Sequence, residues 1–164
     1  MSIAHAMLGE FEHESKTTRK FLERIPQDKL KWKPHEKSHT AGALGLHIAN
    51  VPGNVVRLAL VDESPLPDFA ALFKQPATVQ EILSGHEKSI ETVREILPKL
   101  DDARLMTNWS AMRDGKPAMT MPKVMLLRMI MLNHWIQHRG QLGVYLRLMG
   151  AKVPASYGPS GDEG

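Results

Sequence analysis

Apolar residues recur at intervals of three and four along four long stretches of the chain, a spacing that predicts amphipathic helices. The first predicted helix covers residues 3–25, with Ser2 as its cap and Pro26 as its end. Its expected inward positions are Ile3, Met7, Phe11, Glu14, Thr18, Phe21 and Ile25.

The second predicted helix begins near Ser38 or Thr40 and extends to Leu58. Its expected buried stripe is Leu44, His47, Ile48, Val51, Val55 and Leu58. Pro52 interrupts this stripe, and a proline inside a helix removes one backbone hydrogen bond at a cost of up to about 3 kcal/mol. We therefore expect a kink at Pro52. Residues 62–76 are rich in proline and show neither the spacing of a helix nor the alternation of a strand, which predicts a loop.

The third predicted helix follows Thr78, because residues 78–81 match a capping box. Its stripe is Val79, Ile82, Leu83, His86, Ile90, Val93, Leu97 and Leu100, and Pro98 should end the regular helix before the last of these. Residues 101–116 then form a polar connection, with Asp114 and Gly115 as its turn.

The fourth predicted helix opens near Pro122 and closes at Gly150, a usual residue for a left-handed helix end. Its expected inward positions are Leu127, Met131, His134, His138, Gln141, Tyr145 and Leu148. Four such helices without comparable strand-like alternation predict an all-α four-helix bundle. We expect one domain over residues 1–164, in which residues 151–164 form an irregular tail.

Composition narrows the class of protein. A chain of 164 residues with 42% hydrophobic content can bury one core unaided. The net charge is only +3 and aromatic residues make up 5%, which disfavours nucleic-acid binding. The start of the sequence lacks the features of a signal peptide, and there is no apolar run of about 18 residues, so we expect a cytoplasmic protein with no membrane partner.

Histidines carry the most specific chemical signal. His134 and His138 lie four residues apart, so their side chains leave one helix face about one turn from each other. His47 lies on the apolar stripe of the second helix, where an unpaired imidazole would be costly to bury. The three residues could bind one divalent metal ion, although hydrogen-bonded core histidines are the alternative.

Three further inward polar residues are candidates for catalysis. Gln141 lies one turn beyond His138 and could orient a ligand, or it could form an ordinary hydrogen bond between helices. Glu14 is expected at a solvated end of the bundle, with a general base or a group that holds a ligand imidazole as the alternatives. His86 could serve as a fourth ligand, an acid-base group or a hydrogen-bonded core residue. His39 and the other remaining histidines share no inward register and are treated as peripheral.

Several segments resemble the DinB-like family. The sequence NHWIQHRGQL at residues 133–142 and residues 145–147, 153–154 and 157–160 resemble its C-terminal signature. Residues 32–34 and 44–48 resemble its other landmarks. The resemblance implies a four-helix bundle with a long crossover connection, a centre formed by His47, His134 and His138, and often a homodimer. Relatives include isomerases and S-transferases that use low-molecular-weight thiols.

Two functions follow from this resemblance and from the donor set. The first is a metal-dependent transferase or isomerase that acts on a small-molecule substrate and activates a thiol or water. Zinc or nickel is the expected ion, with iron or manganese as alternatives. The sequence contains no cysteine, so a thiol would have to diffuse in as a cosubstrate. The second is a non-catalytic stress-response protein that binds a metal or ligand.

A second apolar stripe on the fourth predicted helix should face away from the histidines. An exposed stripe of this kind usually marks an interface, so we expect a homodimer. The alternative is that the loop at residues 62–78 covers it. The stripe consists of Met125, Met129, Leu132, Ile136 and Gly143.

Overall fold

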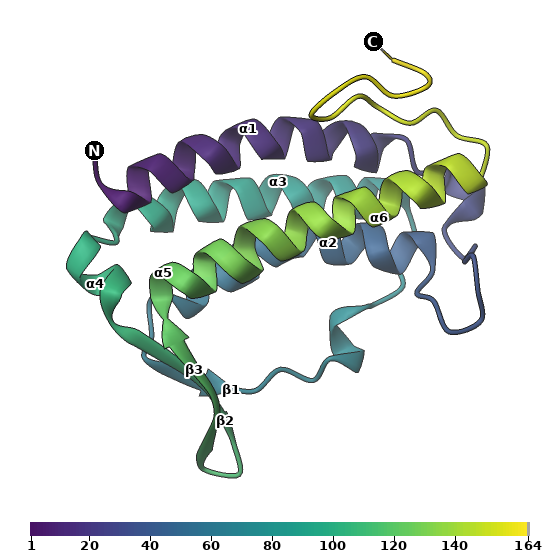
Figure 1. Ribbon diagram of the computed structural model, residues 1–164. Helices are drawn as coiled ribbons and strands as arrows, with labels where there is room; N and C mark the ends of the chain where they lie inside the picture. The colour runs from purple at the N-terminus through teal and green to yellow at the C-terminus, as the bar shows by residue number, and fades with distance from the viewer. Residues whose placement is uncertain (164) are drawn as a thin grey trace.

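Four long helical segments form the body of the protein in the computed structural model, which describes residues 1–163 (Figure 1). Three of them are the helices α1 (Ile3–Glu23), α2 (Ala41–Leu58) and α3 (Val79–Ile96). The fourth consists of α5 (Lys123–Leu126), the π-helix η4 (Leu127–His134) and α6 (Trp135–Leu148), which follow one another without a break. α2 packs against α3 and α6, and α1 packs against the same two helices.

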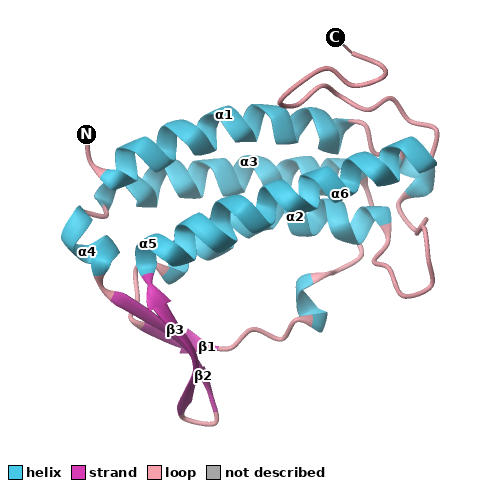
Figure 2. Ribbon diagram, viewed as in Figure 1, coloured by secondary structure: helices cyan, strands magenta, loops and turns pink. Residues whose placement is uncertain are grey.

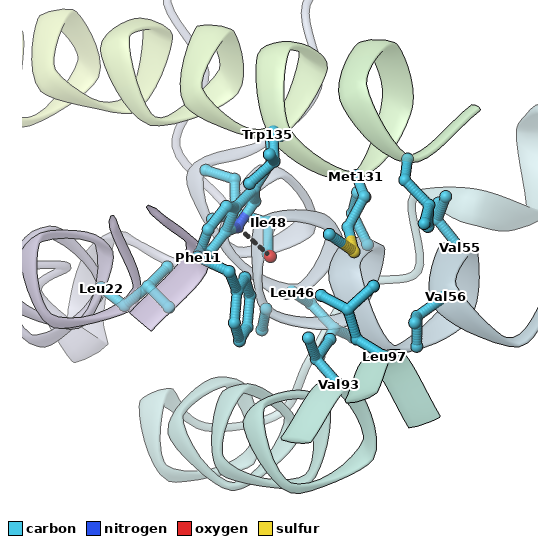
Figure 3. Packing of buried hydrophobic residues seen from close by; sticks show 14 of the residues in the cluster. Phe11, Leu22, Leu46, Ile48, Val55, Val56, Val93, Leu97, Met131 and Trp135 are labelled. Atoms are coloured by element: carbon cyan, nitrogen blue, oxygen red, sulfur yellow. Dashed lines mark hydrogen bonds between the residues drawn. The ribbon is translucent and has the colours of Figure 1, made fainter. Parts of the chain in front are cut away.

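The core lies between these helices, as the apolar stripes predict (Figure 3). Phe11 of α1 stacks on Trp135 of α6 with ring centroids 5.3 Å apart, and both residues are fully buried. Ile48, Val93 and Met131 bring α2, α3 and η4 into the same apolar cluster.

The predicted helix starts are confirmed at atomic level. The Thr40 hydroxyl oxygen accepts a hydrogen bond from the Ala43 amide, so α2 begins at Ala41 and Thr40, not Ser38, is its cap. Ser2 caps α1 and Thr78 caps α3 in the same way. Each hydroxyl satisfies an amide that has no partner within its own helix.

Pro52 lies inside α2 without ending it. Proline has no N–H to donate to the carbonyl four residues earlier, which here belongs to Ile48. The Trp135 indole N–H donates to that carbonyl at 2.9 Å (Figure 3), and the Gly53 amide donates to the Ser89 hydroxyl at 2.7 Å. Side chains of two other helices therefore tie α2 in place at Pro52.

The prediction of a purely α-helical fold is wrong in one region. A three-stranded sheet with the order β1-β2-β3 lies beside one end of the bundle (Figure 2). β1 (Glu63–Pro65) pairs parallel to β2 (Asn108–Arg113), which pairs antiparallel to β3 (Lys116–Pro122). Asp114 and Gly115 form the predicted turn, both with positive φ. The strands are short and β3 is largely exposed, so they give little alternation to detect.

The remaining connections contain short helical pieces. They are η1 (Gln27–Lys29), η2 (Ala70–Leu72), η3 (Leu97–Lys99) and α4 (Asp102–Met106). Thus the connection predicted as a polar loop after the third helix contains one helical turn and a hairpin. The connection between β1 and α3 crosses the bundle on the side of the hairpin (Figure 1).

The predicted outward stripe of the last helix is wrong at two positions. Leu132 is fully buried, and Gly143 packs against the Phe21 ring, whereas Met125 and Met129 are each 44% exposed. Leu148, predicted inward, is 59% exposed. A π-helix has one more residue per hydrogen-bonded turn than an α-helix, so a regular 3.6-residue period misplaces side chains across η4. The homodimer stays a prediction, without a continuous exposed stripe to support it.

Residues 151–163 contain no helix or strand. Asp162 forms an ion pair with Arg147, and Glu163 forms one with Arg24, so the tail lies against the helical body. Among the described residues, no helix combines the length and apolar character needed to cross a membrane.

Candidate metal centre

The rings of His47, His134 and His138 meet between α2 and the last helix. One nitrogen from each ring lies within 4.8 Å of the others. The Nε2 atoms of His134 and His138 are 3.0 Å apart, and the ring of His47 stands edge-on to both. The sequence prediction that these three side chains converge is therefore confirmed.

Two of the rings are held through their Nδ1 atoms. The Nδ1 of His138 lies 2.9 Å from Oε1 of Gln141, and the Nδ1 of His47 lies 3.4 Å from the backbone oxygen of Leu72. Both partners are acceptors, so each Nδ1 carries the hydrogen and each Nε2 carries the lone pair. A carbonyl or amide partner of this kind fixes the tautomer and orientation of metal-ligating histidines.

The Nε2 atom of His47 is buried and has no hydrogen-bond partner within residues 1–163. A buried nitrogen without a partner costs about 1–3 kcal/mol. Nδ1 of His86 and Nδ1 of His134 also lack a partner among the described residues, so the case for a ligand at His47 rests on its meeting two further imidazoles. Two nitrogens bonded to a tetrahedral ion at about 2.1 Å lie roughly 3.4 Å apart. The His134–His138 separation is 3.0 Å and no separation within the group exceeds 4.8 Å, so the three rings could hold one ion after small movements.

Burial favours the neutral form of the His47 and His134 imidazoles. It lowers the pKa of His47 to about 4, with smaller contributions from the neighbouring charges of His138 and His134. Burial, followed by the charge of His138, also lowers the pKa of His134. Only a neutral imidazole has a lone pair for a metal ion, so these rings need not lose a proton before binding.

Two aromatic rings outside the helices border the centre. The Phe73 ring stacks on His47 at 4.2 Å between centroids and on His39 at 3.6 Å. His39 therefore lies next to the centre. The prediction from the sequence that His39 is peripheral is wrong. Periodicity could not detect either residue, because both lie in connections between helices.

Gln141 links the centre to a further hydrogen-bonded chain. Its Nε2 donates to the Tyr145 hydroxyl at 3.5 Å, and that hydroxyl donates to the backbone oxygen of His39 at 3.3 Å. The chain joins α6 to the connection before α2. Gln141 thus lies beside His138, as the sequence predicted, but the expectation that it points inward is wrong, because the residue is exposed.

The other two candidate residues lie elsewhere. Glu14 is only 5% exposed and accepts a hydrogen bond from the buried guanidinium of Arg139, so the expectation of a solvated bundle end is wrong. His86 is buried, and its Nε2 donates to the backbone oxygen of Ser15. It is a hydrogen-bonded core histidine and does not belong to the three-histidine group.

A cavity of about 670 Å³ opens beside the three histidines. His47 and His134 form part of its wall, together with apolar residues from α2, η4, the hairpin and the connection before α3. Cavities of this size usually hold small-molecule ligands. Its lining includes Val51, Val55, Phe73, Trp109, Met121 and Ile130.

Comparisons with known proteins identify the family and the fold. The uncharacterized protein YrdA of Bacillus subtilis is 28% identical over 158 residues, covering 95% of this chain and 89% of that protein. Solved structures of a DinB-like protein from Bacillus cereus and of the DinB-like protein YjoA from Bacillus subtilis have TM-scores of 0.73 and 0.72. Both are 24% identical, and the match covers 93% of this chain and 97% of each of those chains, which shows the shared fold. The DinB family matches residues 1–164, and the chain therefore belongs to that family.

Proposed function

We propose that the protein is a divalent-metal-dependent enzyme whose ligands are His47, His134 and His138. The convergence of three imidazoles, one of which presents a buried Nε2 without a partner in the described part of the chain, is the single observation that carries this proposal. A structural role would require four protein ligands, whereas catalytic zinc sites usually have three and an open position. The three-histidine group fits the second pattern.

The reaction that we propose is a thiol-dependent S-transfer or isomerisation. When bound, the ion would lower the pKa of a coordinated thiol or water toward neutrality. Because the sequence contains no cysteine, the thiol is a diffusible low-molecular-weight cosubstrate. In an S-transfer, sulfur forms a bond to an electrophilic carbon, the thiol proton passes to solvent, and the leaving group departs with the bonding electrons.

The protein's own groups would orient and shield the reactants. The backbone oxygen of Leu72 and the side chain of Gln141 hold two ligand rings in one tautomer. Phe73 covers one face of His47. With a substrate bound, the apolar cavity wall would limit access of water, which strengthens electrostatic interactions inside the site.

Metal content tests the ligand set. Protein purified without an affinity tag should contain about one divalent ion per chain by elemental analysis, with zinc or nickel expected first and iron or manganese as the alternatives. His47→Ala and His138→Ala should lose the ion. His13→Ala, at an exposed position of α1, is the matched control and should retain it. Equal metal content in all four proteins would contradict the proposed ligands.

Turnover tests the reaction. The metal-loaded protein should conjugate or isomerise electrophiles with a low-molecular-weight thiol, and His47→Ala should lose this activity. A panel should combine several bacterial thiols with electrophiles of different size. One bound ion without turnover across that panel would instead support the alternative of a non-catalytic protein that binds a metal or ligand.

A further inference from the structure

The cavity beside the metal centre follows α2 for several turns. Its lining on that helix begins at Leu46 and continues through His47, Val51 and Val55 to Leu58. The twelve steps from Leu46 to Leu58 correspond to about 18 Å of α-helix. The cavity is therefore elongated, and the histidines lie toward one end of its α2 wall.

The opposite wall exposes large apolar side chains. Phe69 and Leu72 come from the connection before α3, and Met119 comes from β3. These three side chains are 61%, 36% and 40% exposed. Apolar side chains gathered at the edge of a cavity usually mark a ligand site, because leaving them in water is unfavourable.

Polar groups are few and unevenly placed. Asn50 and Asn54 lie on the α2 wall, three and seven residues beyond His47. Lys74 is the one charged side chain among the lining residues that the structure describes. The wall thus offers uncharged hydrogen-bonding groups along an otherwise apolar length. This distribution suits a ligand with an apolar body.

We infer that the cavity binds an elongated apolar molecule with an alkyl, acyl or aryl body and one polar group directed at His47 and His134. The assignment of this molecule as the substrate rests on the proposed function. The claim that the molecule binds rests only on the shape and lining of the cavity. The apolar body lies between α2 and the wall formed by Phe69 and Met119, and the polar group lies at the metal centre.

Binding of a homologous series tests the shape and chemistry of the site. Butanol, octanol and dodecanol should displace the neutral fluorescent probe N-phenyl-1-naphthylamine from the wild-type protein. Each buried methylene should raise the affinity by up to about fourfold until the cavity is filled. Affinity that does not rise from butanol to octanol would overturn the inference.

A pair of variants places the binding in this cavity. Met119→Glu puts a carboxylate on the cavity wall and should weaken octanol binding at least about tenfold, because burying a charge opposes an apolar ligand. Met129→Glu is the matched control, since Met129 is similarly exposed, at 44%, and does not line the cavity. Equal affinity in the two variants would overturn the inference. Displacement of the probe that weakens as protein concentration rises would also overturn the inference, because a second copy of the protein would then cover the cavity.

His47→Ala separates this inference from the proposed function. The variant should lose the metal but keep the dependence of affinity on chain length. That result supports the cavity assignment even if the metal-loaded protein shows no turnover. Conversely, metal-dependent turnover confined to small polar electrophiles, with no dependence on chain length, would overturn the assignment of the apolar molecule as the substrate and leave the proposed function standing.

Discussion

At the scale of single residues, the site depends on which ring nitrogen of His47 and His138 forms a hydrogen bond within the protein and which is left to bind a metal ion. The Nδ1 atom of His138 donates a hydrogen bond to Gln141, and the Nδ1 atom of His47 donates one to the Leu72 backbone oxygen. The sequence could predict Gln141, because it follows His138 by three residues on one helix. It could not predict Leu72, because the position of a carbonyl in a long connection depends on contacts distant along the chain.

We predict that Gln141→Leu lowers metal affinity by about 10- to 100-fold, the usual effect of removing a partner that orients a ligand. The His138 ring would then rotate more freely while remaining a ligand. Gln137→Leu changes an exposed glutamine on the same helix and should leave the affinity unchanged. Competition with a fluorescent chelator measures both affinities, and equal affinities in the two variants would contradict this role of Gln141.

We also predict that the metal-free protein loses stability as the pH falls from about 6.5 toward 4. The unfolded chain protonates His47 near pH 6.5, whereas burial lowers the pKa of the folded residue to about 4. The unfolded state binds the extra proton, so acid favours unfolding by up to about 1.4 kcal/mol per pH unit. Urea unfolding at several pH values should give a shallower dependence for His47→Ala; equal slopes would contradict the assignment.

At the scale of elements, one hydrogen bond sets the position of α2 relative to the last helix. Pro52 leaves the Ile48 carbonyl without its helical donor, and Trp135 supplies one. Trp135 follows His134 directly, so this bond lies next to two of the proposed ligands. The sequence predicted a disturbance at Pro52 but not its partner. It also gave no sign of the π-turn in η4, because side-chain periodicity does not reveal backbone hydrogen bonding.

Trp135→Phe tests this connection between the helices. The variant leaves the Ile48 carbonyl buried without a donor, so we expect a loss of about 1–3 kcal/mol in unfolding free energy. We also expect weaker metal binding, because His47 lies on the helix that the bond positions. Chemical denaturation and metal titration measure the two effects. Unchanged values for both would show that the indole N–H has no positioning role.

At the scale of the whole molecule, four helices in the predicted order build the fold and bring the histidines together. Apolar periodicity predicted these helices because long amphipathic segments repeat the same signal several times. The sheet escaped prediction because its strands are short and one is largely exposed. The cavity escaped prediction because α2, the hairpin and the connection at residues 66–74 form it jointly. No local pattern in the sequence predicts that these segments lie together.

The most direct test of the central claim is anomalous diffraction from crystals of the metal-loaded protein, measured at the absorption edge of the bound ion. We predict a single strong peak, with a nitrogen of His47, His134 and His138 each about 2.0–2.1 Å from it. A peak bonded to only one or two of these residues, or located elsewhere in the molecule, would contradict the proposed metal centre.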